Sequence, residues 1–312
     1  MHEDEPLAGA GMAHGKTPAG IARGGQSPEA QLPAGDMLKA LTPARHLAWL
    51  YSTDAQKPVL AALLEIEAEI ASGLRAGIEH HVAHARLQWW SEEAERVAQG
   101  RPVHPLGREL VKARAGAGGS AGEAAHGANI SGLVDTAVWD LASATFETRK
   151  ELTAYCERWA TGMFETAAGP STSLWKTLGA AVREIELLAD AAREAHAGRV
   201  RVPLDELERA GLEPNALSKL PWPAALATLV KERHEALRST IATSVAAVAP
   251  EDQMRSRGLL VWAALTWRQS LRAQHALPNV ILPRRYDALA DGWQAWRAAR
   301  RAAAGKLRMG NS

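Results

Sequence analysis

The sequence predicts an all-α protein. Apolar residues recur every three or four positions over long stretches, which is the spacing of one helix face. The strict alternation of apolar and polar residues that marks a half-buried strand does not occur, and proline and glycine fall where helices would end. With 312 residues, of which 46% are apolar, the chain can bury the core of one large domain or two small ones.

The first part of the chain differs from the rest. Residues 1–36 are rich in Gly, Ala and Pro and contain no apolar run, so we expect a disordered tail there. The same lack of an apolar run argues against a secretory signal in this stretch. We expect residues 37–308 to form one helical domain.

Within this domain, helices are expected in chain order. An early helix covers 60–74, further helical stretches lie within 139–164, and a long helix covers 178–193, which has no β-branched run. The segment 113–132 carries six glycines and few bulky apolar residues, so we expect a flexible loop between two helices.

Composition narrows the function. The 36 basic and 35 acidic residues nearly balance, which argues against a nucleic-acid-binding protein, since such a protein needs a basic face. The single cysteine, Cys156, excludes an internal disulfide and favours a reducing, cytoplasmic compartment. The longest apolar run, Leu259 to Trp267, is far shorter than the ~20 residues that span a bilayer, so we expect a buried helix.

An acidic ladder is the most informative feature of the chain. Glu186, Asp190 and Glu194 are spaced four apart, so a helix places them on one face. Carboxylate oxygens are the ligands that Mg²⁺ prefers, and this ladder is therefore a candidate metal site. Arg183 and Arg193, each three residues from an acid of the ladder, offer ion pairs that would neutralise it without metal.

Five segments, the last two flanking this ladder, resemble the squalene/phytoene synthase family. They are LAALLEIEAEI (60–70), RLQWWSEEAERV with GRPVHPL (86–97, 100–106), ELTAYCERWATG (151–162), LGAAV (178–182) and AGRVRVP (197–203). The resemblance covers residues 40–290 and implies an isoprenoid-synthase-like helical bundle around a central cavity, with Tyr155 at that cavity. It also implies two aspartate-rich motifs that hold Mg²⁺ against two prenyl diphosphates, and transfer of prenyl groups.

The chain departs from the family pattern at both motifs. Alignment of the first motif puts Ala71, Ser72 and Arg75 where the family has aspartates, so a cation replaces metal ligands. The second motif keeps Asp190, but Arg201 replaces the tyrosine of the family's glycine-arginine loop.

Two hypotheses follow. The favoured one is a non-catalytic or altered member of the family that binds prenyl diphosphate or a protein partner in an assembly role. The alternative is an active prenyl transferase that holds its diphosphates through Arg75, Arg199 and Arg201, with a single Mg²⁺ on the acidic ladder. Loss of one whole motif favours the first.

Other polar clusters have simpler interpretations. Glu65 and Glu69 lie four residues apart near the lost motif, and a solvated helix face is the favoured interpretation. His80, His81 and His84 include a pair with metal-ligand spacing, but no third ligand is evident nearby, so a surface or capping role is favoured.

The last basic segment is 291–308. It combines Trp293 and Trp296 with five arginine and lysine residues, a composition typical of helices that lie on anionic membranes. Packing of the two tryptophans on the domain is the favoured interpretation. The alternative is peripheral contact of a cytoplasmic protein with the inner membrane.

Overall fold

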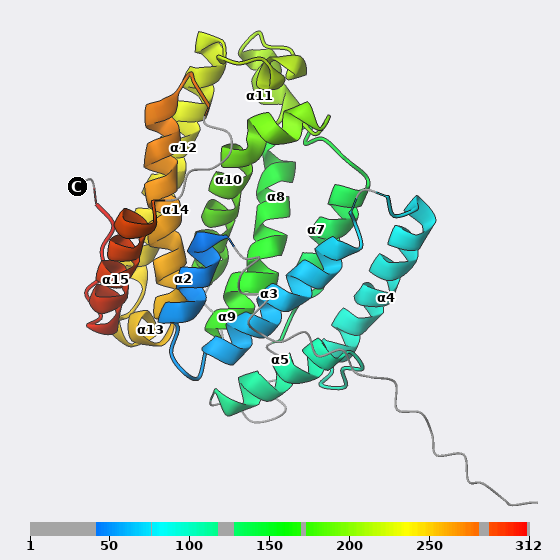
Figure 1. Cartoon of the computed structure of the whole chain (residues 1–312), viewed down its shortest axis with the longest axis vertical. Coiled ribbons are helices and arrows are strands. Elements are labelled where there is room, and N and C mark those ends of the chain that lie inside the picture. Colours follow the sequence, from blue (N-terminus) through cyan, green and yellow to red (C-terminus); the bar gives the residue numbers. More distant parts are fainter. Residues whose placement is uncertain (1–41, 76, 118–127, 170–172, 281–286, 311–312) are drawn as a thin grey trace, which may run out of the picture.

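The computed structural model describes residues 42–75, 77–117, 128–169, 173–280 and 287–310. These residues form helices joined by turns, and no β-strand occurs among them, which confirms the all-α prediction. The elements, in chain order, are α2 (Pro43–Tyr51), α3 (Lys57–Ser72), α4 (His80–Ala98), α5 (Pro105–Gly116), α7 (Ser131–Leu141), α8 (Arg149–Ala160), the π-helical turn η1 (Thr161–Glu165), α9 (Thr166–Ala168), α10 (Ser173–His196), α11 (Leu204–Arg209), the 3₁₀ turn η2 (Pro214–Ser218), α12 (Ala224–Ala247), α13 (Pro250–Arg255), α14 (Arg257–Ala276) and α15 (Ala288–Ala303) (Figure 1).

Helix α10 is the centre of the molecule. Its apolar residues Leu178, Val182, Ile185 and Leu188 recur at helical spacing and are buried. This stripe and its neighbouring positions pack against α8, η1, α12 and α14, so residues on several faces of α10 lie inside the protein. Of the acidic ladder of α10, Glu186 and Glu194 are therefore buried, whereas Asp190 stays partly exposed.

Helix α14 is the second central element. The segment from Leu259 to Trp267 is buried throughout, as the sequence predicted. Helices α2 and α15 both pack on α14 (Figure 1). The approach of α2 is close because Gly258 has no side chain; a Cβ there would lie 2.0 Å from the hydroxyl oxygen of Ser52.

A second group of helices covers the other side of α8. Helix α7 packs on α8, α4 packs on α7, and α3 packs on α5 (Figure 1). At the α7–α8 crossing a Cβ on Gly132 would lie 1.9 Å from the carbonyl oxygen of Arg158, so only glycine allows this approach.

Helix α8 continues directly into the π-helical turn η1. π-helical turns occur mostly as single interruptions of α-helices and are frequent at functional sites. Here the turn lies beside an aromatic cluster of Trp159, Phe164 and Trp262, whose ring centroids are 5.3 to 5.9 Å apart. All three rings are buried, and two of them, Trp159 and Trp262, contact the polar side chains of the candidate site.

The structure narrows one predicted loop. Helix α5 runs to Gly116 and α7 begins at Ser131, so the described ends of the predicted loop 113–132 are helical. Helix propagation from well-packed flanking turns overrides the low apolar content at these ends. Residues 118–127 of the loop and the whole predicted tail 1–36 lie outside the described residues.

Two further expectations concern burial. Cys156 is buried in a cluster with Phe146, Leu152 and Tyr155, and burial raises the pKa of its thiol well above the usual value. In the parts of the chain that the structure describes, no helix combines the length and the apolarity needed to cross a bilayer.

Candidate functional site

The centre of the helical bundle holds an ionic network. Glu67 on α3 and Glu186 on α10 face each other, and Arg45 from α2 lies between them. Nη1 of Arg45 donates to Oε2 of Glu67, and Nη2 donates to Oε1 of Glu67 at 3.4 Å and to Oε2 of Glu186 at 3.3 Å. On the α10 side, Arg183 adds a second ion pair with Glu186, at 3.6 Å. We call these four residues the central ionic network.

Two indole rings fix both carboxylates. Trp159 donates from Nε1 to Glu67 at 2.8 Å, and Trp262 donates from Nε1 to Glu186 at 3.1 Å. The Arg45 guanidinium lies 5.8 Å from the Trp159 ring centroid and 5.0 Å from that of Trp262, within the range of cation–π attraction. Both rings are fully buried, so these contacts form in a low dielectric where they are strong.

Tyr155 belongs to the same centre. Its hydroxyl donates to Asp140 at 3.0 Å and accepts from Arg183 at 3.2 Å. Burial raises the pKa of this phenol to about 12, so Tyr155 stays protonated and serves as a neutral link. The side chain is 1% exposed, which means that packed side chains surround it.

The acidic ladder continues as a second set of ion pairs toward the end of α10. Arg193 lies 2.9 Å from Asp190, as the sequence spacing allowed. Glu194 accepts from Arg199 at 2.8 Å and from Arg201 at 3.4 Å. We call these residues the ladder network; Arg201 also reaches Asp140 at 2.8 Å and so connects it to Tyr155.

The arginines change the chemistry of Glu194. Burial alone would raise the pKa of its carboxyl, but the hydrogen bond from Arg199 and the charges of Arg199, Arg201 and Arg193 outweigh burial and lower it. Glu194 is therefore an anion at neutral pH, and its charge is compensated by groups of the same chain.

This arrangement does not fit a magnesium cluster. Every carboxylate of the ladder lies within 4 Å of an arginine nitrogen. Among the residues that the structure describes, no three His, Cys, Asp or Glu side chains gather as a possible metal site. Mg²⁺ prefers octahedral oxygen ligands and is repelled by neighbouring guanidinium groups, so these carboxylates are poor ligands for it.

The remaining predicted residues lie apart from the two networks. Arg75 is exposed in the turn after α3, beyond the end of the helix. His80, His81 and His84 are exposed on the first turns of α4, and the His80 and His84 rings pack edge to face at 4.6 Å. Glu69 is exposed, whereas Glu65 is half buried, and burial raises the pKa of its carboxyl.

Sequence reasoning missed the partners that complete the centre. Arg45, Glu67 and Trp262 were not among the candidate residues, and Asp140 was not considered. A signal existed for Glu67, because a glutamate among Leu64, Ile66 and Ile70 on a largely apolar helix must find a buried partner. No signal in the chain joins Arg45 to Glu186, which lie 141 residues apart.

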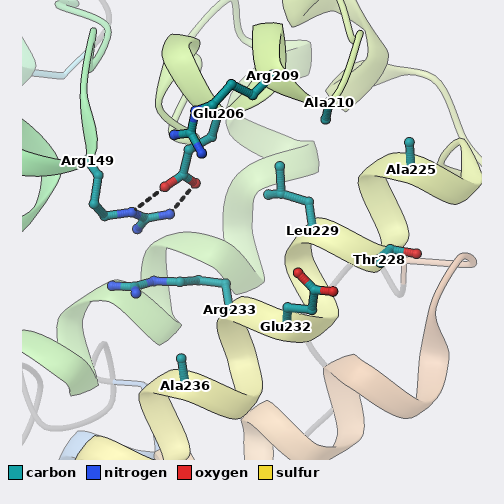
Figure 2. Close-up of a pocket in the computed structure, with 10 residues that line it drawn as sticks. All are labelled: Arg149, Glu206, Arg209, Ala210, Ala225, Thr228, Leu229, Glu232, Arg233 and Ala236. Carbon is teal, nitrogen blue, oxygen red and sulfur yellow. Dashed lines mark hydrogen bonds and ion pairs between the residues drawn. The ribbon is translucent and has the colours of Figure 1, made fainter.

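A separate hollow lies on the surface between α11 and α12 (Figure 2). Its volume is about 600 Å³, and Arg149 and Arg233 line it. Arg149 donates to Glu206 from Nε at 2.6 Å, and Arg233 donates to the buried Glu184 from Nη2 at 2.6 Å. Carboxylates thus hold both arginines in place, and none of the predicted site residues lines this hollow.

Known proteins of one family share this helical architecture. The helices enclose a polar centre between α3 and α10, which is the arrangement of an all-α isoprenoid synthase. The family model for squalene/phytoene synthase matches residues 43–288, and the chain belongs to this family. A search of curated protein sequences finds no match.

A solved structure of similar fold is a crystal structure of a dehydrosqualene synthase in complex with ligand. It superposes with a TM-score of 0.67 at 15% sequence identity, over 86% of this chain and 94% of that one. At this identity the likeness shows the fold.

Proposed function

We propose that this chain is a non-catalytic family member that acts as a binding or assembly protein. One observation carries the proposal: arginines of the same chain bind the carboxylates that face the centre. Arg45 and Arg183 hold Glu186, and Arg199 and Arg201 hold Glu194. Internal cations thus occupy the carboxylates that would otherwise be free to hold the divalent metal which neutralises a diphosphate leaving group.

Charge balance strengthens the proposal. The central and ladder networks, with Asp140, contain five guanidinium groups and five carboxylates, a net charge of zero. They are Arg45, Arg183, Arg193, Arg199 and Arg201 against Glu67, Asp140, Glu186, Asp190 and Glu194. An incoming Mg²⁺ would have to displace an arginine from a short, partly buried ion pair, which leaves that cation without compensation.

Prenyl diphosphate binding without catalysis has support of its own. The Nε–H groups of Arg45, Arg183 and Arg201 are buried and have no hydrogen-bond partner among the described residues. Buried donors of this kind are costly, and an oxygen-rich anion can satisfy them. The retained role would then be recognition of the diphosphate group, independent of metal.

The test is a turnover assay on the purified full chain. Farnesyl or geranylgeranyl diphosphate is supplied with Mg²⁺, and release of diphosphate and formation of an apolar product are measured. We expect neither. Turnover that Asp190→Asn abolishes, while Asp135→Asn on the exposed face of α7 leaves it intact, would establish the active prenyl transferase instead.

A binding assay separates the remaining alternatives. Affinity for a non-hydrolysable prenyl diphosphate analogue is measured in EDTA. Arg75→Ala should leave it unchanged under our proposal, because Arg75 is exposed and outside both networks. A loss of affinity in Arg75→Ala would favour the alternative in which Arg75 anchors a diphosphate.

We also propose that α15 contacts an anionic membrane, such as the cytoplasmic face of the inner membrane. Trp293 is 61% exposed and Trp296 is 37% exposed, so neither ring is buried on the domain as the favoured interpretation held, and Leu289 nearby is 88% exposed. The Trp293 and Trp296 rings stack on each other at 4.7 Å, and the Arg300 guanidinium lies 5.0 Å from the Trp296 ring centroid. Leu289, Trp293 and Trp296 share one helix face, which we call the tryptophan face.

The opposite side of α15 explains why the tryptophans point outward. Ala295, Ala298, Ala299 and Ala302 are buried against the helices that α15 contacts, which include α14 and α13. Small residues let α15 lie close to its neighbours and leave the large rings on the solvent side. Exposed tryptophans beside arginines match the interfacial region of an anionic bilayer.

A further inference from the structure

A hollow of about 220 Å³ lies where α3 meets α4, about one helical turn along α3 from Glu67 of the central ionic network. Its lining residues are Glu69, Ile70, Gly73, Arg86, Trp89, Trp90 and His104. The hollow exceeds the ~150 Å³ cavity that holds benzene, so it has room for a compact group of similar bulk. No candidate role from the sequence and no part of the proposed function uses it.

Three aromatic rings form its walls. The Trp89 and Trp90 rings are nearly perpendicular, at 85° with centroids 5.3 Å apart. The His104 ring lies 5.7 Å from Trp89 and 4.9 Å from Trp90. Trp89 is 38% exposed, and the Arg96 guanidinium lies 5.6 Å from its ring centroid, so this ring already holds one cation. The rings pack edge to face or tilted against one another, and all three line the hollow, so an organic cation in it would contact aromatic surface.

The imidazole of His104, which lines the hollow, is uncharged. Its Nδ1 accepts from the backbone N–H of Leu106 at 3.2 Å, because His104 caps helix α5, and this fixes the uncharged tautomer with its proton on Nε2. Burial lowers the pKa of the imidazole, against the opposing charges of Glu69 and Glu93. An uncharged ring does not repel a cation at neutral pH.

Two opposite charges stand at the rim. Glu69 on α3 and Arg86 on α4 both line the hollow, and both are exposed. A carboxylate beside aromatic walls favours a cation, whereas a guanidinium favours an anion. The rim therefore suits a ligand that carries both charges a few bonds apart.

From these contacts we infer that the hollow binds a zwitterion with a quaternary ammonium group. The trimethylammonium group lies against Trp89, Trp90 and His104 near Glu69, and the anionic group of the same molecule meets Arg86. Phosphocholine and glycine betaine both have this chemistry, the first as a lipid headgroup and the second as a free solute.

Gly73 keeps the hollow open. It has helical backbone angles, so a side chain is conformationally allowed there, and a Cβ would meet the Ile70 carbonyl oxygen at 3.3 Å and the Arg86 side chain at 3.5 Å. A larger side chain at Gly73 would project into the space that the ligand needs. Gly73→Leu is therefore a blocking variant.

The test is isothermal titration calorimetry of the full chain with phosphocholine and with glycine betaine. We expect saturable binding of at least one, weakened at least ~10-fold by Trp89→Ala, Glu69→Gln and Gly73→Leu. Trp89→Phe should retain most of the affinity. The control Met254→Ala shortens a similarly exposed apolar side chain on α13, away from the hollow, and should change nothing.

Arg86→Ala distinguishes a zwitterion site from a simple cation site. It should weaken phosphocholine or betaine but leave tetramethylammonium binding unchanged. Binding to phosphatidylcholine vesicles, which have no net charge, with competition by free phosphocholine, identifies a lipid headgroup. Betaine binding without vesicle binding identifies a solute. No binding of either zwitterion to the folded wild-type chain, or binding that Gly73→Leu and Trp89→Ala do not alter, overturns the inference.

Discussion

Glu67 accepts three hydrogen bonds, two from Arg45 and one from Trp159. Its carboxylate is the charge that allows Arg45 to lie between two indole rings. Glu67→Gln removes this charge and leaves a largely buried guanidinium undercompensated, so we expect a loss of about 3 kcal/mol in the free energy of unfolding. Urea unfolding followed by circular dichroism measures it.

The control for this variant is on the same helix. Glu69→Gln changes an exposed carboxylate and should alter stability by no more than ~0.5 kcal/mol. Equal effects of the two substitutions would mean that the central ionic network does not contribute to stability.

His234 on α12 gives a pH-dependent prediction. Burial, and then the charge of Arg238, lower the pKa of its imidazole from 6.5 to about 4. Between pH 6.5 and pH 4, His234 is protonated in the unfolded chain and neutral in the folded chain. The free energy of unfolding therefore falls as the pH decreases from about 6.5 to about 4. The pKa difference corresponds to about 3 kcal/mol.

His234→Asn isolates this effect. The Asn side chain still offers an acceptor to Ser270, which lies 3.0 Å from Nδ1 of His234. We expect the variant to lose less stability than the wild type between pH 6.5 and pH 4, measured by urea unfolding at each pH. Parallel pH profiles would show that His234 does not carry the dependence.

At the residue level, local spacing was informative and distant pairing was not. The pairs Arg183–Glu186 and Arg193–Asp190 follow from the i,i+3 geometry of one helix, and the structure contains both. Arg45 reaches Glu186 only because α2 packs on α14 beside α10, a tertiary fact without local sequence signal. The sequence therefore predicted part of the charge neutralisation at the site, but it did not predict the role of Arg45.

At the scale of elements, the α7–α8 crossing depends on one glycine. Gly132→Ala would place a Cβ 1.9 Å from the Arg158 carbonyl oxygen, and backbone of α8 must move to accept it. We expect a loss of about 3 kcal/mol, measured as the free energy of unfolding in urea. Gly116→Ala, at the end of α5 with nothing within 4 Å, should cause no loss, and a comparable loss there would contradict the steric explanation.

Helix α15 gives the second prediction at this scale. The tryptophan face and its arginines should bring the protein down with vesicles that contain anionic phosphatidylglycerol, and less so at high salt, because salt screens the arginines. The double variant Trp293→Ala/Trp296→Ala should reduce co-sedimentation several-fold without changing the far-ultraviolet circular dichroism. Val138→Ala, which shortens an exposed apolar side chain on α7, serves as the control.

Element prediction succeeded where packing and local pattern agree. The apolar stripes of α3, α10 and α14 have helical spacing and are buried, so their existence followed from the sequence. The orientation of α15 did not follow, because its tryptophans and its alanines are both apolar. Close helix packing selected the alanines for the interior, which composition alone does not reveal.

For the whole molecule, the family fold is kept although the charged residues of the site differ from the family pattern. The order of five family-like segments predicted an isoprenoid-synthase fold, and the match of the family model over residues 43–288 supports it. The same fold can hold metal between facing acids or, as here, arginines that neutralise them. Fold is set by apolar patterning over many residues, whereas the site depends on a few charges whose exchange leaves the packing intact.

The whole-molecule prediction concerns magnesium itself. A metal that binds only the folded state stabilises it by RT ln(1 + [L]/Kd), about 2.7 kcal/mol at a concentration 100-fold above Kd. Because the ten charges of the networks already balance, we expect millimolar Mg²⁺ to leave the thermal unfolding midpoint where it lies in EDTA, with or without a prenyl diphosphate analogue. Differential scanning calorimetry measures this, with Ca²⁺ as the control for non-specific ion effects. A rise in the midpoint that is specific to Mg²⁺ and lost in Asp190→Asn would show that the ladder still binds metal and would reopen the case for catalysis.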